Sequence, residues 1–450
     1  MELKIKKGLD LPIVGAVPPE AVNEPQPVAS PVVAIIPDDF DGFIPKVDVQ
    51  PGDTVMAGSP LMHHKALPQV KLVSPVAGTV KAVVRGERRK VLRVEIEADA
   101  KATGYAAMPT AGKDRMEVAD LLAQSGLLAM MRQRPYFIVP DPSKSPRDIF
   151  VTAFDSAPLA LTEAYTDAQA QTMAAGVQML KKLTDGDVYI SRRAGQMPDV
   201  AGAVMVDVAG PHPAGLAGVQ IANIKPVNKG ESVWTLTADT LMKVGQLAQT
   251  GTIDWTMTVA VTGSCVKQPY VAKALPGTAI EAFVGGKCSC VDKKGNERHM
   301  RIISGNVLTG VKVDKDGYLH APHTQITVIP EGDDVNEFMG WASMSPSHMS
   351  TSPSYPGHWL KHLFKPDARI LGGRRAMIMS GLYDKVMPMD IVPEYLIKAI
   401  NAGDIDKMER LGIYEVAPED FALAEYVDSS KQPLQAIVRN GLNLMRKETE

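Results

Sequence analysis

Cysteine is scarce in this chain, and long apolar runs and an excess of positive charge are absent. Three of the 450 residues are cysteine, too few for a disulfide framework, so we expect a reducing compartment. No stretch approaches the roughly 18 consecutive apolar residues of a membrane-spanning helix, and the first fourteen residues do not resemble a signal peptide. The formal net charge of -3 gives no electrostatic footprint for nucleic acid, which we exclude as a partner.

The sequence also lacks a phosphate-binding motif at the turn where we would look for one. The apolar run Ala203–Val208 predicts a buried parallel strand, and the turn Gly210–Gly218 after it lies where an open α/β sheet places its ligand. This turn matches neither GxGxxG nor GxxxxGKS/T, and Pro211 and Pro213 remove two amide donors that a phosphate would need. We therefore interpret it as a rigid turn that faces a partner, or that once suited a cofactor.

Length and composition predict several domains with real cores. The hydrophobic content of 45% with 22% charged residues is ordinary for a soluble globular protein, and this length corresponds to roughly three domains. The patterns described below divide the chain into four, so we predict an α/β multidomain protein. We place the domains at residues 1–105, 106–254, 255–330 and 331–450.

The first domain is predicted to be all-β. In Lys46–Glu97, short apolar alternations are separated by PGD, AGS and SPVAG turns, an arrangement that resembles the biotinyl/lipoyl barrel-sandwich hybrid. Lys65 falls near the position of that family's acceptor lysine, so one hypothesis is a lipoyl or biotinyl carrier. The other is a structural domain with an ordinary surface lysine: His63 and His64 precede Lys65, and neither a lipoyl site's acidic residue nor a biotinyl site's flanking methionines are present.

The second domain is predicted to be a Rossmann-like parallel sheet with crossover helices, because strands and helices alternate at βαβ spacing. A linker at Ala98–Lys113, rich in Ala, Gly and Thr, precedes it. The polar turn Asp155–Ser156 is either catalytic or a cap for the next element. The expected elements are helices at Met116–Met131 and Ala168–Leu183 and strands at Ile149–Phe154, Asp187–Ile190 and Ala203–Val208.

The third domain, whose pattern of strands begins at Thr258, resembles the SLBB (soluble-ligand-binding β-grasp) domain. It has two strands, then a Pro-Gly-Thr turn that opens a short helix ending at Gly285–Gly286. Cys265, Cys288 and Cys290 lie in it without C-x-x-C spacing, and His299 is the one nearby candidate for a fourth ligand. We interpret the cysteines as structural, with a metal or redox pair at Cys288 and Cys290 as the alternative.

The fourth domain is predicted to be a small helical bundle. Periodic apolar residues and glycine stops predict its helices. His358 and His362 stand four residues apart and would share a helix face, and we interpret them as surface or interdomain histidines. The expected helices are Pro393–Ala402, Asp404–Leu411, Pro418–Tyr426 and Pro433–Lys447.

Taken together, these segments resemble the A subunit of the Na+-translocating NADH:quinone reductase over essentially the whole chain. The related C subunit of the Rnf complex carries a glycine-rich flavin loop and two cysteine runs, but Leu127–Ile138 lacks the loop and Gly381–Val427 contains no cysteine. Where the reductase family often has FVCPGK, residues 426–431 read YVDSSK, so no role of that cysteine carries over. The matching segments are KIKKGLDLPI, RQRPYF, VTAFDSAPLA, GPHPAGLAG, RRAMIMSGLYDKVMPMDIVP and GDIDKMERLGIYEVAPEDFALAEYV.

The resemblance implies a peripheral subunit on the cytoplasmic side of the bacterial inner membrane, in a complex that oxidises NADH, reduces quinone and exports Na+. It implies contact with the membrane-embedded B subunit, and it leaves NADH, flavins and iron–sulfur centres on other subunits. We expect no catalytic, cofactor-binding or metal residue on this chain. For contact with quinone or a partner we name Arg132, Arg134, His212 and Pro213, because fixed cations beside aromatic rings can hold a quinone. The alternatives are an Rnf-type electron-transfer subunit and a free-standing carrier that uses Lys65.

Overall fold

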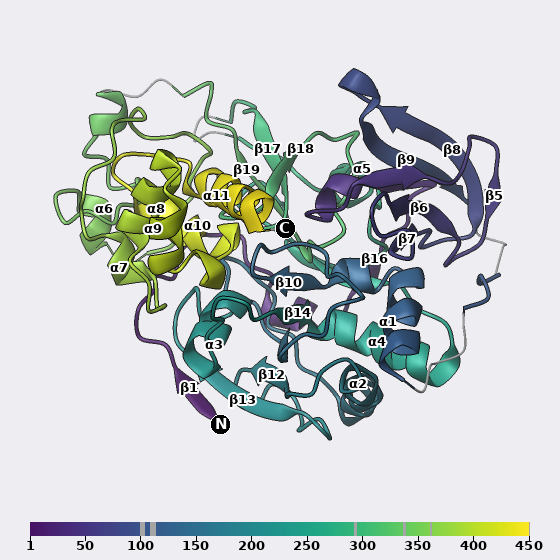
Figure 1. Ribbon diagram of the computed structural model, residues 1–450. Helices are drawn as coiled ribbons and strands as arrows, with labels where there is room; N and C mark the ends of the chain where they lie inside the picture. Colours follow the sequence, from purple (N-terminus) through teal and green to yellow (C-terminus); the bar gives the residue numbers. More distant parts are fainter. Residues whose placement is uncertain (100–103, 109–113, 292–294, 336–338, 361, 450) are drawn as a thin grey trace.

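The computed structural model describes the chain except for residues 100–103, 109–113, 292–294, 336–338, 361 and 450. Figure 1 shows a β-rich sandwich, an α/β sheet, a second mixed sheet and a group of C-terminal helices, which agrees with the α/β multidomain class expected from the sequence. The expected linker at Ala98–Lys113 lies partly outside the described residues.

The N-terminal sandwich consists of two small antiparallel sheets. Their strand orders are β3-β9-β8-β5 and β4-β6-β7, as the alternating apolar pattern predicts. Lys65 is exposed in the turn that joins β6 to β7. The strands are β3 (Val32–Ile35), β4 (Pro45–Val47), β5 (Thr54–Val55), β6 (Pro60–His64), β7 (Lys71–Val73), β8 (Gly78–Arg85) and β9 (Val91–Ala98).

The α/β domain is a three-layer sandwich around a six-stranded sheet ordered β1-β13-β12-β11-β14-β10, in which the edge strand β10 is antiparallel. Ile149 and Val151 share a core with α1, α2 and α4, whereas Phe150 packs with Ile221 of α3 on the other face. The elements are α1 (Arg115–Gln124), β10 (Arg132–Arg134), β11 (Ile149–Thr152), α2 (Asp167–Leu180), β12 (Val188–Arg192), β13 (Val204–Ala209), α3 (Ala217–Ile224), β14 (Val233–Thr237) and α4 (Ala238–Thr250).

The strand order corrects one expectation about the ligand crevice. The chain passes from β11 through β12 to β13 on one side and places β14 on the other side of β11. The topological switch point is therefore between β11 and β14, not at the end of β13, where we expected it from the sequence. The expected helix Met116–Met131 also ends early, at Gln124, since Gly126 has a positive φ of 82°.

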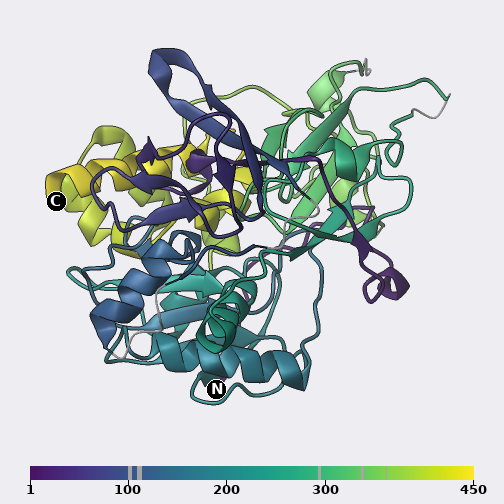
Figure 2. The same cartoon turned by 90° about the vertical axis from the view of Figure 1, so that its right-hand side faces the viewer.

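The β-grasp sheet has the order β18-β17-β19-β15-β16-β2. The strand β2 (Gln26–Pro27) comes from the N-terminal segment, and β1 (Glu2–Lys4) pairs in parallel with β13 of the α/β sheet. Figure 2 shows this purple segment beside the β-grasp domain. Two strands within residues 1–105 thus complete sheets of other domains. The remaining elements are β15 (Met257–Thr262), β16 (Tyr270–Ala274), α5 (Glu281–Val284), β17 (Met300–Ser304), β18 (Val311–Val313) and β19 (Gln325–Pro330).

The C-terminal helices cover one side of the α/β domain and share a core with Val206 and Val208 of β13 and Val219 of α3. The expected helices are present, but α6 ends at Trp359, so His358 and His362 do not share a helix face and that expectation is wrong. The helices are α6 (Pro356–Trp359), α7 (Tyr383–Val386), α8 (Pro393–Ala402), α9 (Ile405–Arg410), the 3-10 helix η7 (Pro418–Phe421), α10 (Ala422–Val427) and α11 (Leu434–Thr449).

Candidate functional site

The segment RQRPYF begins as the edge strand β10 and continues as a tight loop. The backbone of Gln133 and Ile138 closes the loop with two hydrogen bonds of 2.7 and 3.2 Å. Between them, Tyr136 and Phe137 have positive φ angles of 80° and 53°, a conformation that bulky residues rarely adopt. The loop leaves the Phe137 ring half-buried at its tip.

Arg134, one of the predicted contact residues, is completely buried. Its Nη1 donates to Asp420 Oδ2 at 2.8 Å and its Nη2 to Glu419 Oε1 at 3.0 Å. Burial opposes the charge, but these two carboxylates outweigh it and raise the pKa of the guanidinium. Asp420 Oδ2 also accepts from the backbone N–H of Ala417 at 2.8 Å. Arg134 therefore joins β10 to η7 from the inside.

Glu419 is the second carboxylate bound to Arg134, and its surroundings disfavour its charged form. Its side chain is 28% exposed and bound to Arg134. Burial raises the pKa of Glu419 above its usual range, the Arg134 guanidinium lowers it, and neighbouring Asp420 raises it further. Arg134 therefore stabilises the charged form of this carboxyl group at the edge of the buried ion pair.

Arg132 has a different set of partners. Its Nη2 donates to the carbonyl of Asp39 at 2.8 Å, and its Nη1 donates to the carbonyls of Ala129 and Met131 at 2.8 and 3.0 Å. The half-buried side chain therefore ties the N-terminal sandwich to the α/β domain, so most of its donors serve the fold.

Three guanidinium groups surround the Phe137 ring. The carbon atoms Cζ of Arg132, Arg134 and Arg439 lie 5.9, 5.4 and 5.8 Å from its centroid, within the range of cation–π interaction. Arg439, on α11, also donates to the carbonyl of Tyr136 at 2.9 Å and to Asp41 Oδ2 at 2.9 Å. We call Arg132, Arg134, Arg439 and Phe137 the arginine cluster.

His212 and Pro213 are buried in the turn after β13. His212 Nδ1 lies 3.0 Å from Ser156 Oγ, which accepts from the N–H of Gly215 at 2.8 Å, and the N–H of His212 donates to Asp10 Oδ1 at 2.8 Å. The other ring nitrogen, Nε2, is buried without a hydrogen-bond partner in the described part of the chain. Burial lowers the pKa of His212 to about 4, so the ring is neutral at physiological pH.

The turn and the arginine cluster meet at Gly218, near the start of α3. A Cβ atom on Gly218 would lie 2.4 Å from both carboxylate oxygens of Asp420 and 2.5 Å from Nη1 of Arg134. The two segments that we paired from the sequence are therefore neighbours, although the C-terminal helices cover Arg134. Asp420 was not among the predicted residues, and its only signal was its position in a segment quoted for the family resemblance.

The cysteines form a separate, mostly buried group in the β-grasp domain. Burial raises the pKa of Cys265, which contacts Cys290, and raises the pKa of Cys288 to about 11. His299 pairs instead with Asp333, at 3.0 Å. Within the described ranges, the residues close enough to hold a metal ion are His299, Asp333 and Asp334, a group without cysteine.

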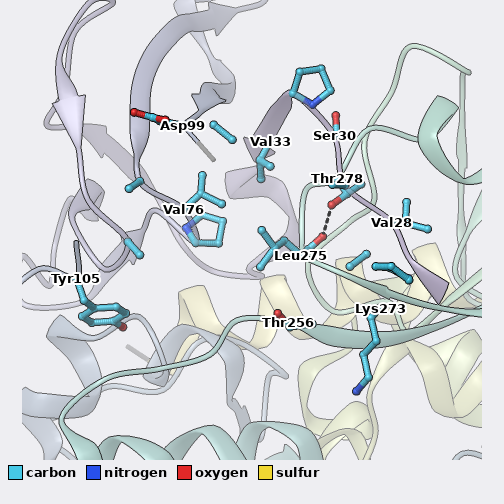
Figure 3. A pocket seen from close by; sticks show the side chains of 18 of the residues that line it. Val28, Ser30, Val33, Val76, Asp99, Tyr105, Thr256, Lys273, Leu275 and Thr278 are labelled. Carbon is cyan, nitrogen blue, oxygen red and sulfur yellow. Dashed lines mark hydrogen bonds between the residues drawn. The ribbon is translucent and has the colours of Figure 1, made fainter. Parts of the chain in front are cut away.

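A pocket of about 970 Å³ lies between the sandwich and the β-grasp domain (Figure 3). Most of its lining is apolar, and Thr256 and Lys273 are among its polar residues. None of the four predicted contact residues lines it. Its lining includes Asp99 and Gly104.

Comparison with known proteins identifies the family. The chain is 36% identical to the A subunit of the Na(+)-translocating NADH-quinone reductase of Serratia proteamaculans, over 99% of this chain and 100% of that protein. It is 34% identical to the corresponding protein of Neisseria meningitidis serogroup A and 35% identical to that of Rhodopirellula baltica, over 99% of this chain and 100% and 98% of those proteins. The chain belongs to this family of reductase A subunits.

Family models of the same A subunit match three successive regions of the chain. These are the NqrA N-terminal barrel-sandwich hybrid domain at residues 3–99, the NqrA second alpha/beta domain at 113–253 and the NQRA C-terminal domain, of SLBB type, at 258–315. The fold class and the family resemblance drawn from the sequence are thus confirmed.

A solved structure, an NAD+-reducing NiFe-hydrogenase in the air-oxidized state, is similar over 76% of this chain and 69% of that one, with 13% identity. Its TM-score of 0.35 does not establish a shared fold. No helix in the described part of the chain is both long and apolar enough to cross a bilayer.

Proposed function

We propose that this chain is a peripheral subunit of a Na+-translocating complex that oxidises NADH, reduces quinone and exports Na+. The observation that carries the proposal is the match of nearly its whole length to proteins named as the A subunit of that reductase. In this proposal the chain lies on the cytoplasmic side of the inner membrane and contacts the membrane-embedded B subunit. Alone, it has no oxidoreductase activity.

The same proposal assigns NADH, flavins and iron–sulfur centres to other subunits. A flavin phosphate needs free backbone N–H groups at a glycine-rich turn or a helix start. Pro135 interrupts the loop of the arginine cluster, and Pro211 and Pro213 interrupt the turn after β13. Neither segment offers such a run of donors.

Purification of the tagged chain from its native membrane tests this assignment. We expect it to bring down the other subunits together with NADH-quinone reductase activity. The chain purified alone should be colourless and inactive. A stoichiometric flavin on the isolated chain, or activity without partner subunits, would contradict the proposal.

We further propose that the chain contributes to quinone contact through the loop Arg132–Phe137 and the turn Gly210–Gly218. Support comes from the half-buried Phe137 ring, which lies amid three guanidinium groups, and from the contact between this loop and the turn at Gly218. Because Arg134 and His212 are buried, their role in this proposal is to hold the loop and the turn in place. Arg132 belongs to the same loop and Pro213 to the same turn.

A photoreactive quinone bound to the intact complex separates this site from the interdomain pocket. Cross-linked peptides from residues 132–137 or 210–218 would support the proposal, and Phe137→Leu, which keeps much of the apolar bulk but removes the ring, should reduce the labelling. Labelling confined to peptides that contain Val28, Val76 or Leu275 would place the quinone in the pocket and refute it.

A further inference from the structure

The segment 339–380, which we call the strap, exposes an unusual number of apolar side chains. It makes up less than a tenth of the sequence, yet it carries half of the large apolar side chains that are exposed in the described part of the chain. This enrichment within one segment sets the strap apart from the rest of the described surface. The exposed residues are Met339, Met344, Trp359, Leu360, Leu363, Ile370, Ile378 and Met379.

The strap is held against the protein at three places. Phe364 is buried, its N–H donates to the carbonyl of Pro12 at 2.7 Å, and its carbonyl accepts from Val14 at 2.9 Å. Farther along, the N–H of Ala368 donates to Pro330 and that of Arg375 to Ser430, both at 3.0 Å. The backbone is therefore attached between Phe364 and Arg375, while a neighbouring side chain faces outward: Leu363, beside the buried Phe364, is 61% exposed.

The charge of the strap is opposite to that of the whole chain. Its one acidic residue, Asp367, is held by Arg369 at 2.9 Å, against five lysines and arginines in the same segment. Lys365 and Arg374 are exposed and form no ion pair with any described residue. Since the chain as a whole carries -3, the strap concentrates positive charge on a slightly acidic protein.

We propose that the strap binds the anionic surface of a lipid bilayer directly. Trp359, Leu363 and Ile370 enter the headgroup region, where a tryptophan ring has one apolar side and one wet side. Lys365 and Arg374 attract anionic lipid headgroups. Apolar side chains that enter the headgroup region and basic side chains that attract anionic lipids are two signals that together strengthen peripheral attachment.

A bilayer suits this surface better than a protein partner does. The exposed apolar residues are spread along a strap whose regular structure, in its described part, is limited to short helical turns such as the four-residue α6. Protein interfaces need a matching shape around a central anchor, whereas a bilayer deforms around separate side chains. Figure 1 shows α6 at the outer edge of the molecule, beyond α8 and α9. The inference rests on the proposed peripheral location of the chain.

Flotation of the full-length purified chain with lipid vesicles tests the inference. We expect binding to phosphatidylcholine vesicles that contain phosphatidylglycerol, weaker binding to pure phosphatidylcholine, and release by salt, which screens the basic side chains. The variant Trp359→Ser/Leu363→Ser/Ile370→Ser should bind the anionic vesicles about tenfold more weakly.

A matched control removes three exposed apolar side chains outside the strap: Ile44→Ser/Met56→Ser/Met116→Ser, at positions that are 56%, 45% and 53% exposed. This variant should bind vesicles like the wild type. No vesicle binding by the wild type, or equal loss in both triple variants, would overturn the inference.

Co-purification of the strap variant with the partner subunits gives the second readout. If the variant binds vesicles normally but loses its partners, the strap is a protein interface and the inference is wrong. Failure of the proposed function is visible separately, because the wild-type chain would then recover no partner subunits whatever its behaviour with vesicles.

Discussion

Arg134 and Arg374 belong to two regions that treat charge in opposite ways. Arg134, in the arginine cluster, has no exposed surface and is bound to Asp420 and Glu419. Arg374, in the strap, is exposed and has no ion pair among the described residues. Residue type in the sequence therefore does not show which arginine is available to a partner. An arginine is available to a partner only if no acidic residue from a distant part of the chain pairs with it in the folded protein.

The difference also separates two kinds of functional hypothesis. In the cluster, the cations are satisfied within the chain, so a ligand there would meet an aromatic ring and a backbone that the cations hold in place. In the strap, exposed apolar side chains accompany Lys365 and Arg374, which form no ion pair with any described residue, so a partner gains both contacts at once. The following predictions test this contrast, from the largest expected effect to the smallest.

Removing the charge of Arg134 should reduce the stability of the folded protein more than any other change proposed here. Arg134→Met leaves Asp420 buried without its cation, and breaking a buried pair in this way costs about 3–5 kcal/mol of folding free energy. Arg374→Met, the same change in the strap, should stay within about 0.5 kcal/mol. Chemical unfolding followed by circular dichroism checks both.

The double variant Arg134→Met/Asp420→Leu sharpens the test. If the cost comes from the stranded carboxylate, removing it as well should recover much of the stability. Equal unfolding midpoints for Arg134→Met and Arg374→Met would contradict the prediction, because they would show that the buried arginine stabilises the fold no more than the exposed one.

Acid should destabilise the protein through the buried His212 and the half-buried His323. Burial lowers the pKa of His212, and likewise of His323, from 6.5 to about 4, so the unfolded chain takes up these protons first as pH falls. The stability present above pH 6.5 is lost as the pH falls from about 6.5 to about 4, by about 3 kcal/mol for the buried His212. His212→Asn should remove its share of that loss, as measured by melting temperature against pH.

His358→Asn is the control for this experiment, because His358 is exposed in the strap. It should leave the pH profile as in the wild type. An unchanged profile for His212→Asn would mean that the ring of His212 does not stay neutral in the folded chain.

Gly218→Ala should disturb the place where the turn meets the cluster. Its methyl group would lie 2.4 Å from the Asp420 carboxylate and 2.5 Å from Arg134. Overpacking of this kind costs about 1–3 kcal/mol. Gly373→Ala, in the strap and with open space around its Cβ, is the matched control. Equal thermal stability of the two variants would contradict the tight packing at Gly218.

The parts of the fold that the sequence predicts are those set by neighbouring residues, such as the ends of helices. The helix α8 has the expected bounds, Pro393–Ala402, since Pro393 starts it and Gly403, with a φ of 66°, ends it. Of the strands of the α/β sheet, β11, β12 and β13 were predicted from their apolar runs, whereas β1, β10 and β14 were not predicted. The strand order was not predicted either, because β1, from the first residues, joins β13 through contacts that no local pattern encodes.

The sequence names the loop and the turn of the candidate site but does not show how deeply their side chains are buried. The loop Arg132–Phe137 and the turn Gly210–Gly218 were paired from the sequence, and they are neighbours. The burial of Arg134 was not foreseen, because its partner Asp420 follows 286 residues later. The strap was not foreseen either, since the expected bundle at 331–450 becomes regularly helical only from α7 onward.

The smallest effect is expected at Lys65, which tests whether exposure alone makes a lysine functional. Lys65 is exposed in the turn between β6 and β7, the position that a lipoyl or biotinyl carrier would use. We predict that it is unmodified and that Lys65→Ala stays within about 0.5 kcal/mol of the wild type and keeps the activity of the complex.

The strap lysine Lys365 is the counterpart of Lys65: Lys365→Ala should weaken binding to anionic vesicles, whereas Lys65→Ala should not. Mass spectrometry of the peptide that contains Lys65 tests for modification. A mass increment of a lipoyl or biotinyl group there would contradict the prediction and make this turn the functional site. Without that increment, the two lysines differ only in their surroundings. An exposed lysine then contributes to membrane binding where exposed apolar side chains lie near it, because only there can the membrane make both an electrostatic and an apolar contact.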